Sequence, residues 1–296
     1  MVGLLIAPAP ASRELGLRIA NILNAPWVEV ESKVFPDGES YVRFCRDLTG
    51  EEVMLVQSTH PPQDSHLIQL FLLIDAAFTH GARRVSAVVP YIAYARQDKV
   101  FRTWEAVSIK TILKLLHEQG LHRLITVNMH EPAVLSDLKI QAENLDATPA
   151  VGAYLKGLKL NKPVVFAPDK RAFPMARKLG EMLSAESGWL TKERDRLTGQ
   201  IHMTCEVDLD FSGRDFIIAD DIISTGGTVA LAARMLRERG AARITCACVH
   251  PLLTGDAYDK ILAAGVSEIV GTDTVPSRVG KVSVAPTIAE GLSHST

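Results

Sequence analysis

Two adjacent aspartates and a loop of small residues form the first candidate site in the sequence. In the stretch FIIADDIISTGGTVA, four apolar residues precede Asp220 and Asp221, and a short polar loop follows. The loop consists of Ser224, Thr225, Gly226, Gly227 and Thr228. Consecutive backbone N–H groups, hydroxyls and the N-terminus of a following helix bind a phosphate well. The two glycines also lack the Cβ atoms that would block close approach of a ligand.

The aspartates suggest what is attached to that phosphate. Asp220 and Asp221, at the end of the strand, can accept hydrogen bonds from vicinal hydroxyls of a sugar whose phosphate lies in the loop. The ligand implied is a phosphorylated sugar. The alternative is a helix N-cap and tight turn beside two solvated acids. The arrangement resembles the phosphoribosyl-diphosphate-binding loop of type I phosphoribosyltransferase-like folds.

Strand-like runs alternate with amphipathic helical runs along the chain, which predicts an α/β fold with a mostly parallel sheet. Strands are expected within EVMLVQS, RRVSAVVPYI, HRLITVNMH, KPVVFAPD, DFIIADD and ARITCACVHP, and helices within SHLIQLFLLIDAAFTHG, SIKTILKLLHEQG, AFPMARKLGEMLS and TVALAARMLRERG. In such sheets ligands bind at the edge where the strands end. The acid pair and its loop are therefore expected at that edge.

A weak internal repeat divides the chain into two similar phosphoribosyltransferase-like halves, each a mostly parallel sheet flanked by helices. The segments that start at Val53 and Phe216 share the order strand, polar loop, long helix, Gly-Ala, basic residue, strand and proline. Two domains are therefore expected, residues 1–147 and 148–296. Only the second copy has the aspartate pair and the Thr-Gly-Gly-Thr turn, so the halves are expected to have different roles.

Composition excludes several classes of protein. The chain of 296 residues has 32 Lys+Arg against 34 Asp+Glu and a net charge of -2, which disfavours nucleic-acid and membrane-surface binding. The apolar segment 67–78 is interrupted by Gln69 and Asp75 and is too short to span a membrane. The N-terminus predicts a first strand rather than a signal peptide, so a cytoplasmic protein is expected. Its four cysteines include no C-x-x-C pair, which favours buried thiols over a Cys/His metal site.

Five further stretches narrow the family. FPDGES at 35–40, PYIAYARQDKVF at 90–101, VNMHE at 127–131, APD at 167–169 and TKERDRLTG at 191–199 occur in the same order as in ribose-phosphate pyrophosphokinases. The sequence resembles that family over nearly all of its length. The resemblance implies transfer of the β,γ-diphosphoryl group of ATP to the C1 hydroxyl of ribose 5-phosphate, with release of AMP and a requirement for Mg²⁺.

The resemblance also implies where ATP binds, since the chain has neither a G-x-x-x-x-G-K-[ST] nor a G-x-G-x-x-G motif. Residues that match the family's adenine pocket are Phe35, Asp37 and Glu39 from one subunit and Arg96 and Gln97 from another. An aromatic ring can stack on the base, and an arginine can face the phosphates. A homo-oligomer with shared ATP sites is therefore expected.

His130 and Asp169 match the family's magnesium-binding positions, although a hard cation prefers oxygen ligands and His130 can act through bound water. Two residues depart from the family pattern. Asn128 stands where many members have aspartate, which affects a carboxylate contact. Arg171 stands where glycine is usual after the acid, which affects the shape of the pyrophosphate-binding loop.

The segment TKERDRLTG matches the family's catalytic flexible loop and is expected to be a solvated connection in the free enzyme. The match implies that Lys192 and Arg194 close over the phosphates when ATP is bound. Diphosphoryl transfer needs positioning and charge neutralisation, which a lysine and an arginine both supply. Two alternatives stay open: a phosphoribosyltransferase that consumes the product, and a catalytically silent regulatory homologue that only binds nucleotides.

Overall fold

Parallel strands form the centre of each half of the chain. The computed structural model describes residues 4–137, 139–194, 201–205 and 209–293. These divide into unit 1, residues 1–146 with 274–276 and 283–296, and unit 2, residues 147–273 with 277–282. The predicted domains placed all of 148–296 in the second domain, but segments 274–276 and 283–296 belong to unit 1. The reason is that α8 (Ala285–Ser293) packs against α1 (Arg13–Leu23) and β7 (Gln141–Leu145).

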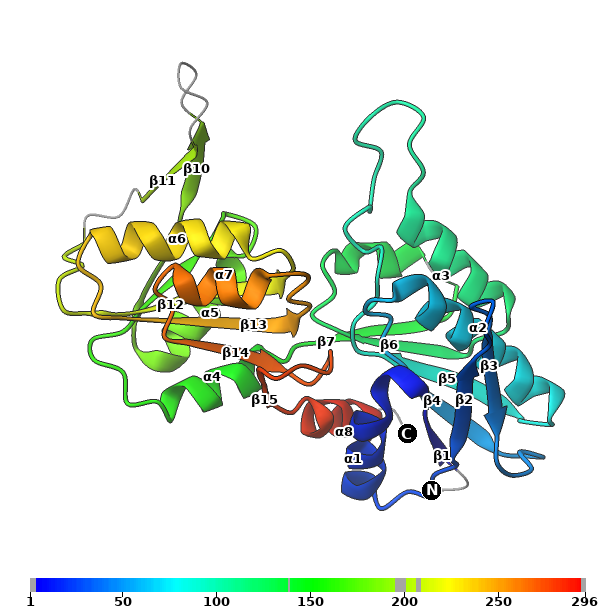
Figure 1. Ribbon diagram of the computed structural model, residues 1–296. Helices are drawn as coiled ribbons and strands as arrows, with labels where there is room; N and C mark the ends of the chain where they lie inside the picture. Colours follow the sequence, from blue (N-terminus) through cyan, green and yellow to red (C-terminus); the bar gives the residue numbers. More distant parts are fainter. Residues whose placement is uncertain (1–3, 138, 195–200, 206–208, 294–296) are drawn as a thin grey trace. The chain divides into compact units, whose positions relative to one another are not determined.

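Unit 1 is built on a five-stranded parallel sheet in the order β1-β4-β5-β6-β7 (Figure 1). Helices α2 and α3 pack on one face through a single apolar cluster. A separate antiparallel pair, β2 and β3, forms a hairpin. The elements not yet given are β1 (Leu4–Pro8), the 3₁₀ helix Pro10–Ser12, β2 (Val30–Val34), β3 (Ser40–Phe44), β4 (Glu52–Val56), α2 (Gln63–Thr79), β5 (Arg84–Val89), α3 (Ser108–Glu118), β6 (Arg123–Val127) and the 3₁₀ helix Pro132–Asp137.

Unit 2 is built on a six-stranded parallel sheet in the order β15-β14-β13-β12-β8-β9 (Figure 1). Its elements are α4 (Thr148–Lys156), β8 (Val164–Ala167), α5 (Phe173–Leu183), β9 (Glu186–Trp189), β10 (Thr191–Arg194), β11 (Ile201–Thr204), β12 (Asp215–Ile223), α6 (Gly227–Glu238), β13 (Arg243–Pro251), α7 (Ala257–Ala263), β14 (Glu268–Thr272) and β15 (Gly280–Val282).

Alternation along the unit 2 strands explains the helices on both faces of the sheet. Phe216 and Ile218 pack into one apolar cluster with α6 and α7, whereas Ile217 and Ala219 pack into another with α4 and α5. Successive strand residues point to opposite faces, so an apolar run buries both. The predicted α/β class and the two mostly parallel, helix-flanked sheets are confirmed.

The internal repeat corresponds to β4–α2–β5 in unit 1 and β12–α6–β13 in unit 2. In both, the two strands pair in parallel as direct neighbours. The loop after the first strand of each repeat therefore lies at the carboxyl edge of its own sheet. None of the described helices is long and apolar enough to cross a membrane. Cys246 and Cys248 are buried thiols as expected, whereas Cys45 is exposed and Cys205 is half-buried.

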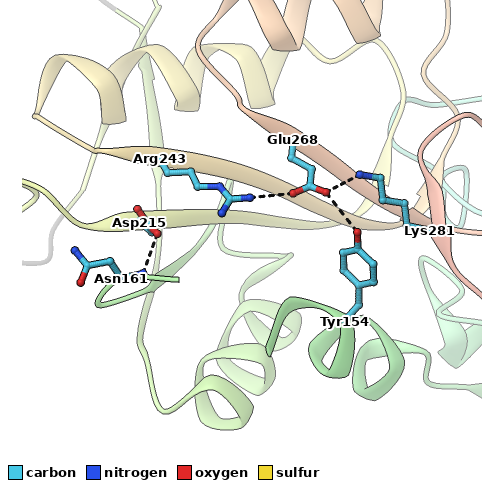
Figure 2. A network of polar contacts seen from close by, with 6 residues as sticks. All are labelled: Tyr154, Asn161, Asp215, Arg243, Glu268 and Lys281. Atoms are coloured by element: carbon cyan, nitrogen blue, oxygen red, sulfur yellow. Dashed lines mark hydrogen bonds and ion pairs between the residues drawn. The ribbon is translucent and has the colours of Figure 1, made fainter. Parts of the chain in front are cut away.

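A polar network crosses the sheet of unit 2 (Figure 2). Glu268 on β14 accepts hydrogen bonds from Arg243 Nη2 at 3.1 Å and from Tyr154 Oη at 3.4 Å, and it forms an ion pair with Lys281. Nearby, the backbone N–H of Asn161 donates to Asp215 at 2.8 Å. Burial raises the pKa of Glu268, but the bond from Lys281 and the charges of Lys281 and Arg243 outweigh it, so the net pKa is lowered.

Glu268→Gln is expected to lower the free energy of unfolding at neutral pH by about 1–2 kcal/mol, because charge-assisted bonds weaken. A lowered folded-state pKa adds stability above the ordinary value of 4.5, and that stability is lost as the pH falls through the folded-state pKa. The variant and the parent should therefore converge in acid. Urea denaturation between neutral and acidic pH measures this. Glu181→Gln, in an exposed pair with Arg177, is the control and should change little. An equal loss in both variants would contradict the prediction.

Candidate active site

The candidate sugar-phosphate loop joins β12 to α6, as predicted. Gly226 has a φ of 69°, in the left-handed region. A Cβ at this residue would lie 2.9 Å from the side chain of Ile261 on α7 and 3.1 Å from the Ala257 carbonyl oxygen. A Cβ at Gly227 would meet nothing within 4 Å. The two glycines therefore differ: Gly226 is required for packing against α7, whereas Gly227 leaves open space in front of the helix N-terminus.

The segment after β13 supports the loop from behind. The backbone N–H groups of Leu253 and Thr254 donate to the carbonyl oxygens of Ile223 and Ser224, each at 3.0 Å. Lys260 Nζ on α7 donates to the carbonyl oxygen of Thr225 at 3.4 Å. Three successive carbonyls, the last of β12 and the first two of the loop, thus bond to residues between 253 and 260. The loop's conformation is held by tertiary contacts as well as by its own small residues.

Asp220 and Asp221 lie within β12, not after it, because Ile222 and Ile223 continue the pairing with β13. Both are half-buried. The N–H of Asp221 donates to Asp220 Oδ1 at 2.9 Å, and the N–H of Ile222 donates to Asp221 Oδ1 at 2.8 Å. Burial raises the pKa of Asp220 well above its ordinary value, and the charges of Asp221 and Asp169 raise it further. The acids therefore crowd negative charge at one edge of the sheet.

Asp169 follows β8, the strand that pairs with β12. Its Oδ1 accepts hydrogen bonds from the N–H groups of Arg171 at 2.9 Å and Ala172 at 3.0 Å. These bonds organise the turn that contains Arg171 and leads into α5. The structure therefore brings Asp169 into electrostatic reach of the aspartate pair. Within the described ranges, no group of three or more His, Cys, Asp or Glu side chains forms a ready-made metal site.

His130 lies in unit 1, after β6, whereas Asp169 lies in unit 2. The neighbouring Asn128 has a φ of 38° and donates from Nδ2 to Asp146 Oδ1 at 2.9 Å. Asparagine tolerates this left-handed conformation. An aspartate at 128 would place a second carboxylate against Asp146, so the asparagine suits this chain.

The FPDGES motif forms the turn of the β2–β3 hairpin. The Phe35 N–H donates to the Glu39 carbonyl at 2.8 Å, and the Glu39 N–H donates to Asp37 Oδ1 at 3.2 Å. Phe35 is 39% exposed. Lys33 Nζ lies 4.6 Å from the centre of the Phe35 ring and 4.7 Å from that of Tyr41. The hairpin thus presents an aromatic ring, two acids and a cation together.

Arg96 and Gln97 lie in the long connection between β5 and α3. Arg96 is exposed. Gln97 Nε2 donates to Glu105 Oε2 at 3.3 Å, and that carboxylate also accepts from the N–H groups of Phe101 and Arg102. No hydrogen bond, ion pair or ring contact among the described residues joins Arg96 or Gln97 to Phe35, Asp37 or Glu39. The candidate ATP residues therefore lie on two different elements of unit 1, the β2–β3 hairpin and the β5–α3 connection.

Lys192 and Arg194 lie on strand β10, which pairs with β11 in an antiparallel ribbon. Residues 191–194 of the expected solvated connection thus form a strand. The remainder of the TKERDRLTG motif, residues 195–199, lies outside the described part of the chain.

Comparison with known proteins decides the family. Ribose-phosphate pyrophosphokinase from Sulfurisphaera tokodaii is 40% identical over 292 residues, which cover 98% of this chain and 100% of the relative. The chain belongs to the ribose-phosphate pyrophosphokinase family. Residues 4–120 match the N-terminal domain of ribose phosphate pyrophosphokinase, and residues 141–280 match the phosphoribosyl transferase domain.

Two further proteins are similar to this chain over nearly its whole length. The protein of that name from Methanothermobacter thermautotrophicus is 40% identical and covers 97% of this chain and 99% of its own. The crystal structure of phosphoribosylpyrophosphate synthetase from Mycobacterium smegmatis is 26% identical with a TM-score of 0.88, covering 99% of this chain and 98% of that chain. The predicted family resemblance is confirmed.

Sequence reasoning missed three residues that contact the candidate sites. Thr254 and Lys260 bond to the sugar-phosphate loop, and Lys33 lies over the Phe35 ring. Lys33 lies two residues before Phe35 and could have been noticed beside FPDGES. Lys260 lies 35 residues from Thr225 on another helix, and no local pattern marks it.

Proposed function

We propose that this protein transfers the β,γ-diphosphoryl group of ATP to the C1 hydroxyl of ribose 5-phosphate, giving phosphoribosyl pyrophosphate and AMP. The observation that carries the proposal is the half-buried acid pair on β12 beside an open, glycine-containing helix N-terminus. The C1 oxygen attacks the β-phosphorus and releases its proton to solvent, while the bond from the β-phosphorus to the α,β-bridging oxygen breaks. AMP leaves with that oxygen.

The unit 2 site binds the sugar. The 5-phosphate lies against the N–H groups and hydroxyls of Ser224, Thr225, Gly226, Gly227 and Thr228. The positive end of the α6 dipole adds to this attraction. Asp220 and Asp221 accept hydrogen bonds from the ribose hydroxyls, which orients C1 away from the phosphate loop. Ligand hydroxyls also supply donors to a pair of acids that otherwise repel each other.

The residues present fit a magnesium ion that arrives with ATP. Burial raises the pKa of Asp220, and the neighbouring carboxylates of Asp221 and Asp169 raise it further, so three acids lie within electrostatic reach of one another. Mg²⁺ is usually bound by one or two carboxylates, waters and substrate phosphates rather than by an all-protein cage. Asp169 would bind the ion through its carboxylate, and His130 would contact it directly or through a bound water. When bound, the ion neutralises charge on the transferring phosphates.

Two subunits of a cytoplasmic homo-oligomer build the ATP site. Phe35 stacks on the adenine, and Asp37 and Glu39 accept from its exocyclic amine. Arg96 faces the phosphates from the other subunit, with Gln97 beside it. Each group lies on its own element, the β2–β3 hairpin or the β5–α3 connection, so each can serve a site that the other group completes from a second subunit.

The β10–β11 ribbon supplies the cations for the transfer step. Lys192 and Arg194 neutralise charge on the diphosphoryl group as its bond to the α-phosphate breaks. Closure of this segment over ATP also excludes water, which otherwise competes with the sugar as acceptor.

Release of AMP from ATP that depends on ribose 5-phosphate tests the proposal. A phosphoribosyltransferase would require a nucleobase and phosphoribosyl pyrophosphate instead and would release no AMP under these conditions. A regulatory homologue would bind nucleotide without turnover. Either result would contradict the proposed activity.

A mixture of two inactive variants tests the shared ATP site. Phe35→Ala and Arg96→Ala should each impair use of ATP, because each removes one surface of every site. After subunit exchange, hybrid oligomers should contain some sites with both surfaces intact and recover up to about a quarter of parental activity, as random pairing predicts for symmetric assemblies.

Activity of the mixture should rise with the same time course as subunit exchange, measured by fluorescence transfer between labelled subunits. A mixture of Phe35→Ala with Asp37→Ala is the control, because both changes damage the same surface and no hybrid site is repaired. Complete exchange without recovery in the first mixture would show that one chain builds the whole site.

A further inference from the structure

The cation on α7 behind the sugar-phosphate loop has no part in the proposed activity so far. Lys260 Nζ bonds to the Thr225 carbonyl at 3.4 Å and to Asp256 Oδ1 at 2.9 Å. Its side chain is 38% exposed, so it is partly shielded by the loop it contacts. Close packing of Ile261 on Gly226 holds α7 against the same loop.

The contact fixes the orientation of one peptide group. The only cis peptide in the described residues is Pro61–Pro62, so the peptide between Thr225 and Gly226 is trans. In a trans peptide the C=O and N–H point in opposite directions. A carbonyl held by Lys260 therefore turns the Gly226 N–H away from α7. Among the described residues, that N–H donates to no acceptor.

The helix start beyond Gly226 offers more unpaired donors. The first N–H groups of an α-helix have no intrahelical acceptor, and here these include Gly227 and Thr228. Because Lys260 holds the Thr225 carbonyl, the Gly226 N–H adds a third donor just before those of Gly227 and Thr228. No described protein group accepts from it. The open space at Gly227 lets an anion approach these donors.

We infer that Lys260 is a positioning residue for the phosphate of ribose 5-phosphate. It acts through the Thr225 peptide, which it orients so that the Gly226 N–H is available to the anion, and its positive charge adds attraction from behind the loop. The inference rests on the proposed function, because it assumes that a sugar phosphate occupies this loop. It names a residue on a neighbouring helix that affects sugar affinity without touching the sugar.

Lys260→Met tests this role, because methionine keeps most of the length of the side chain and removes the donor and the charge. Calorimetric titration of ribose 5-phosphate, with Mg²⁺ and α,β-methylene-ATP present, should show a Kd about tenfold higher, the effect of one charge-assisted hydrogen bond. The KM for ribose 5-phosphate should rise equally, while kcat and the KM for ATP stay near parental values. Lys260→Arg should restore most of the affinity.

Arg278→Met is the matched control. Arg278 stacks on Tyr258 of the same helix, 3.2 Å from the ring centre, and lies 3.9 Å from Asp259. The change removes the same charge near α7 without touching the loop, so the Kd should stay within about twofold of the parent, as for other exposed charges.

The outcomes separate the inference from the function on which it rests. Equal affinity of the parent and Lys260→Met would overturn the positioning role alone, as would an equal loss in Arg278→Met or a fall in kcat and ATP affinity together. A parent protein that binds no ribose 5-phosphate under these conditions would overturn the proposed function and the inference with it. Thermal melting of each variant shows whether unit 2 remains folded.

Discussion

Lys192→Ala and Arg194→Ala should each lower kcat by roughly 10³ or more, the scale on which charge-stabilising arginines act in phosphoryl transfer. The KM values for ATP and ribose 5-phosphate should remain nearly unchanged. The physical reason is that the two cations interact more strongly with the transferring diphosphoryl group in the transition state than in the ground state. Steady-state kinetics with both substrates varied measures the separation of kcat from KM.

The double variant distinguishes a shared action from two independent ones. If both residues act through one closure of the β10–β11 ribbon, the double variant should lose less than the product of the single effects. Glu193→Gln, between them on β10, is the control for disturbance of the strand. A folded protein with parental kcat in both single variants would remove this segment from catalysis.

Asp220→Asn and Asp221→Asn should each raise the KM for ribose 5-phosphate by roughly ten- to a hundredfold, because a charged acceptor contributes about 1.5–3 kcal/mol. The KM for ATP should change much less, since the acids are proposed to bind the sugar hydroxyls. Initial-rate measurements at saturating ATP and at saturating sugar measure the two constants separately. Asp259→Asn, an exposed acid on α7, is the control.

Asp220→Asn should also make the free protein more stable. The pKa of Asp220 is raised by burial and by neighbouring acids, so the folded state binds the proton more tightly than the unfolded chain. Stability is therefore lost as the pH rises from the ordinary value of 3.8 through the raised pKa. An amide carries no charge and avoids that loss, so Tm at neutral pH should rise by a few degrees.

A higher Tm together with weaker sugar binding in Asp220→Asn would indicate that this acid contributes to ligand binding at a cost in stability. Melting curves from acid to neutral pH should show the Tm difference shrink as the pH falls, because the parental carboxyl then becomes protonated. A lower Tm in Asp220→Asn at neutral pH, or an unchanged KM for the sugar with a raised KM for ATP, would contradict the role given to this acid.

Local patterns were sufficient to predict the strand, the loop and the helix start at the candidate sugar-phosphate site. FIIADDIISTGG contains the buried strand, the acids and the turn in twelve consecutive residues, and the periodicity of each part is visible without the fold. The strand ran two residues further than expected, because Ile222 and Ile223 keep their pairing with β13. The different requirements at Gly226 and Gly227 depended on α7, which the local sequence does not show.

Tertiary contacts account for what the sequence did not predict. The C-terminal helix α8 joins unit 1 because it packs on α1, more than 260 residues earlier in the chain. A domain boundary placed between the two repeats cannot predict that the C-terminal helix packs on the N-terminal unit. The charged segment from Thr191 reads as a loop, because it has no apolar alternation. In the structure its first four residues form β10, which pairs with β11 in an antiparallel ribbon.

The departure at Asn128 shows the same dependence on distant residues. In the sequence, it reads as the loss of a carboxylate beside His130. In the structure, Asp146 supplies a carboxylate that accepts from the Asn128 amide at 2.9 Å. The pair is separated by 18 residues and is brought together by the parallel strands β6 and β7.

The position of bond cleavage in ATP tests the central claim most directly. ATP that carries ³³P at the α-position and ³²P at the γ-position is incubated with the protein, Mg²⁺ and ribose 5-phosphate, and the products are separated. The account predicts that ³³P appears in AMP and ³²P in the sugar product in equal amounts, both only when ribose 5-phosphate is present. Two results would contradict the account. One is ³³P in ADP together with ³²P in a ribose bisphosphate, which would show transfer of the γ-phosphoryl group alone. The other is that ATP is not cleaved in the presence of ribose 5-phosphate.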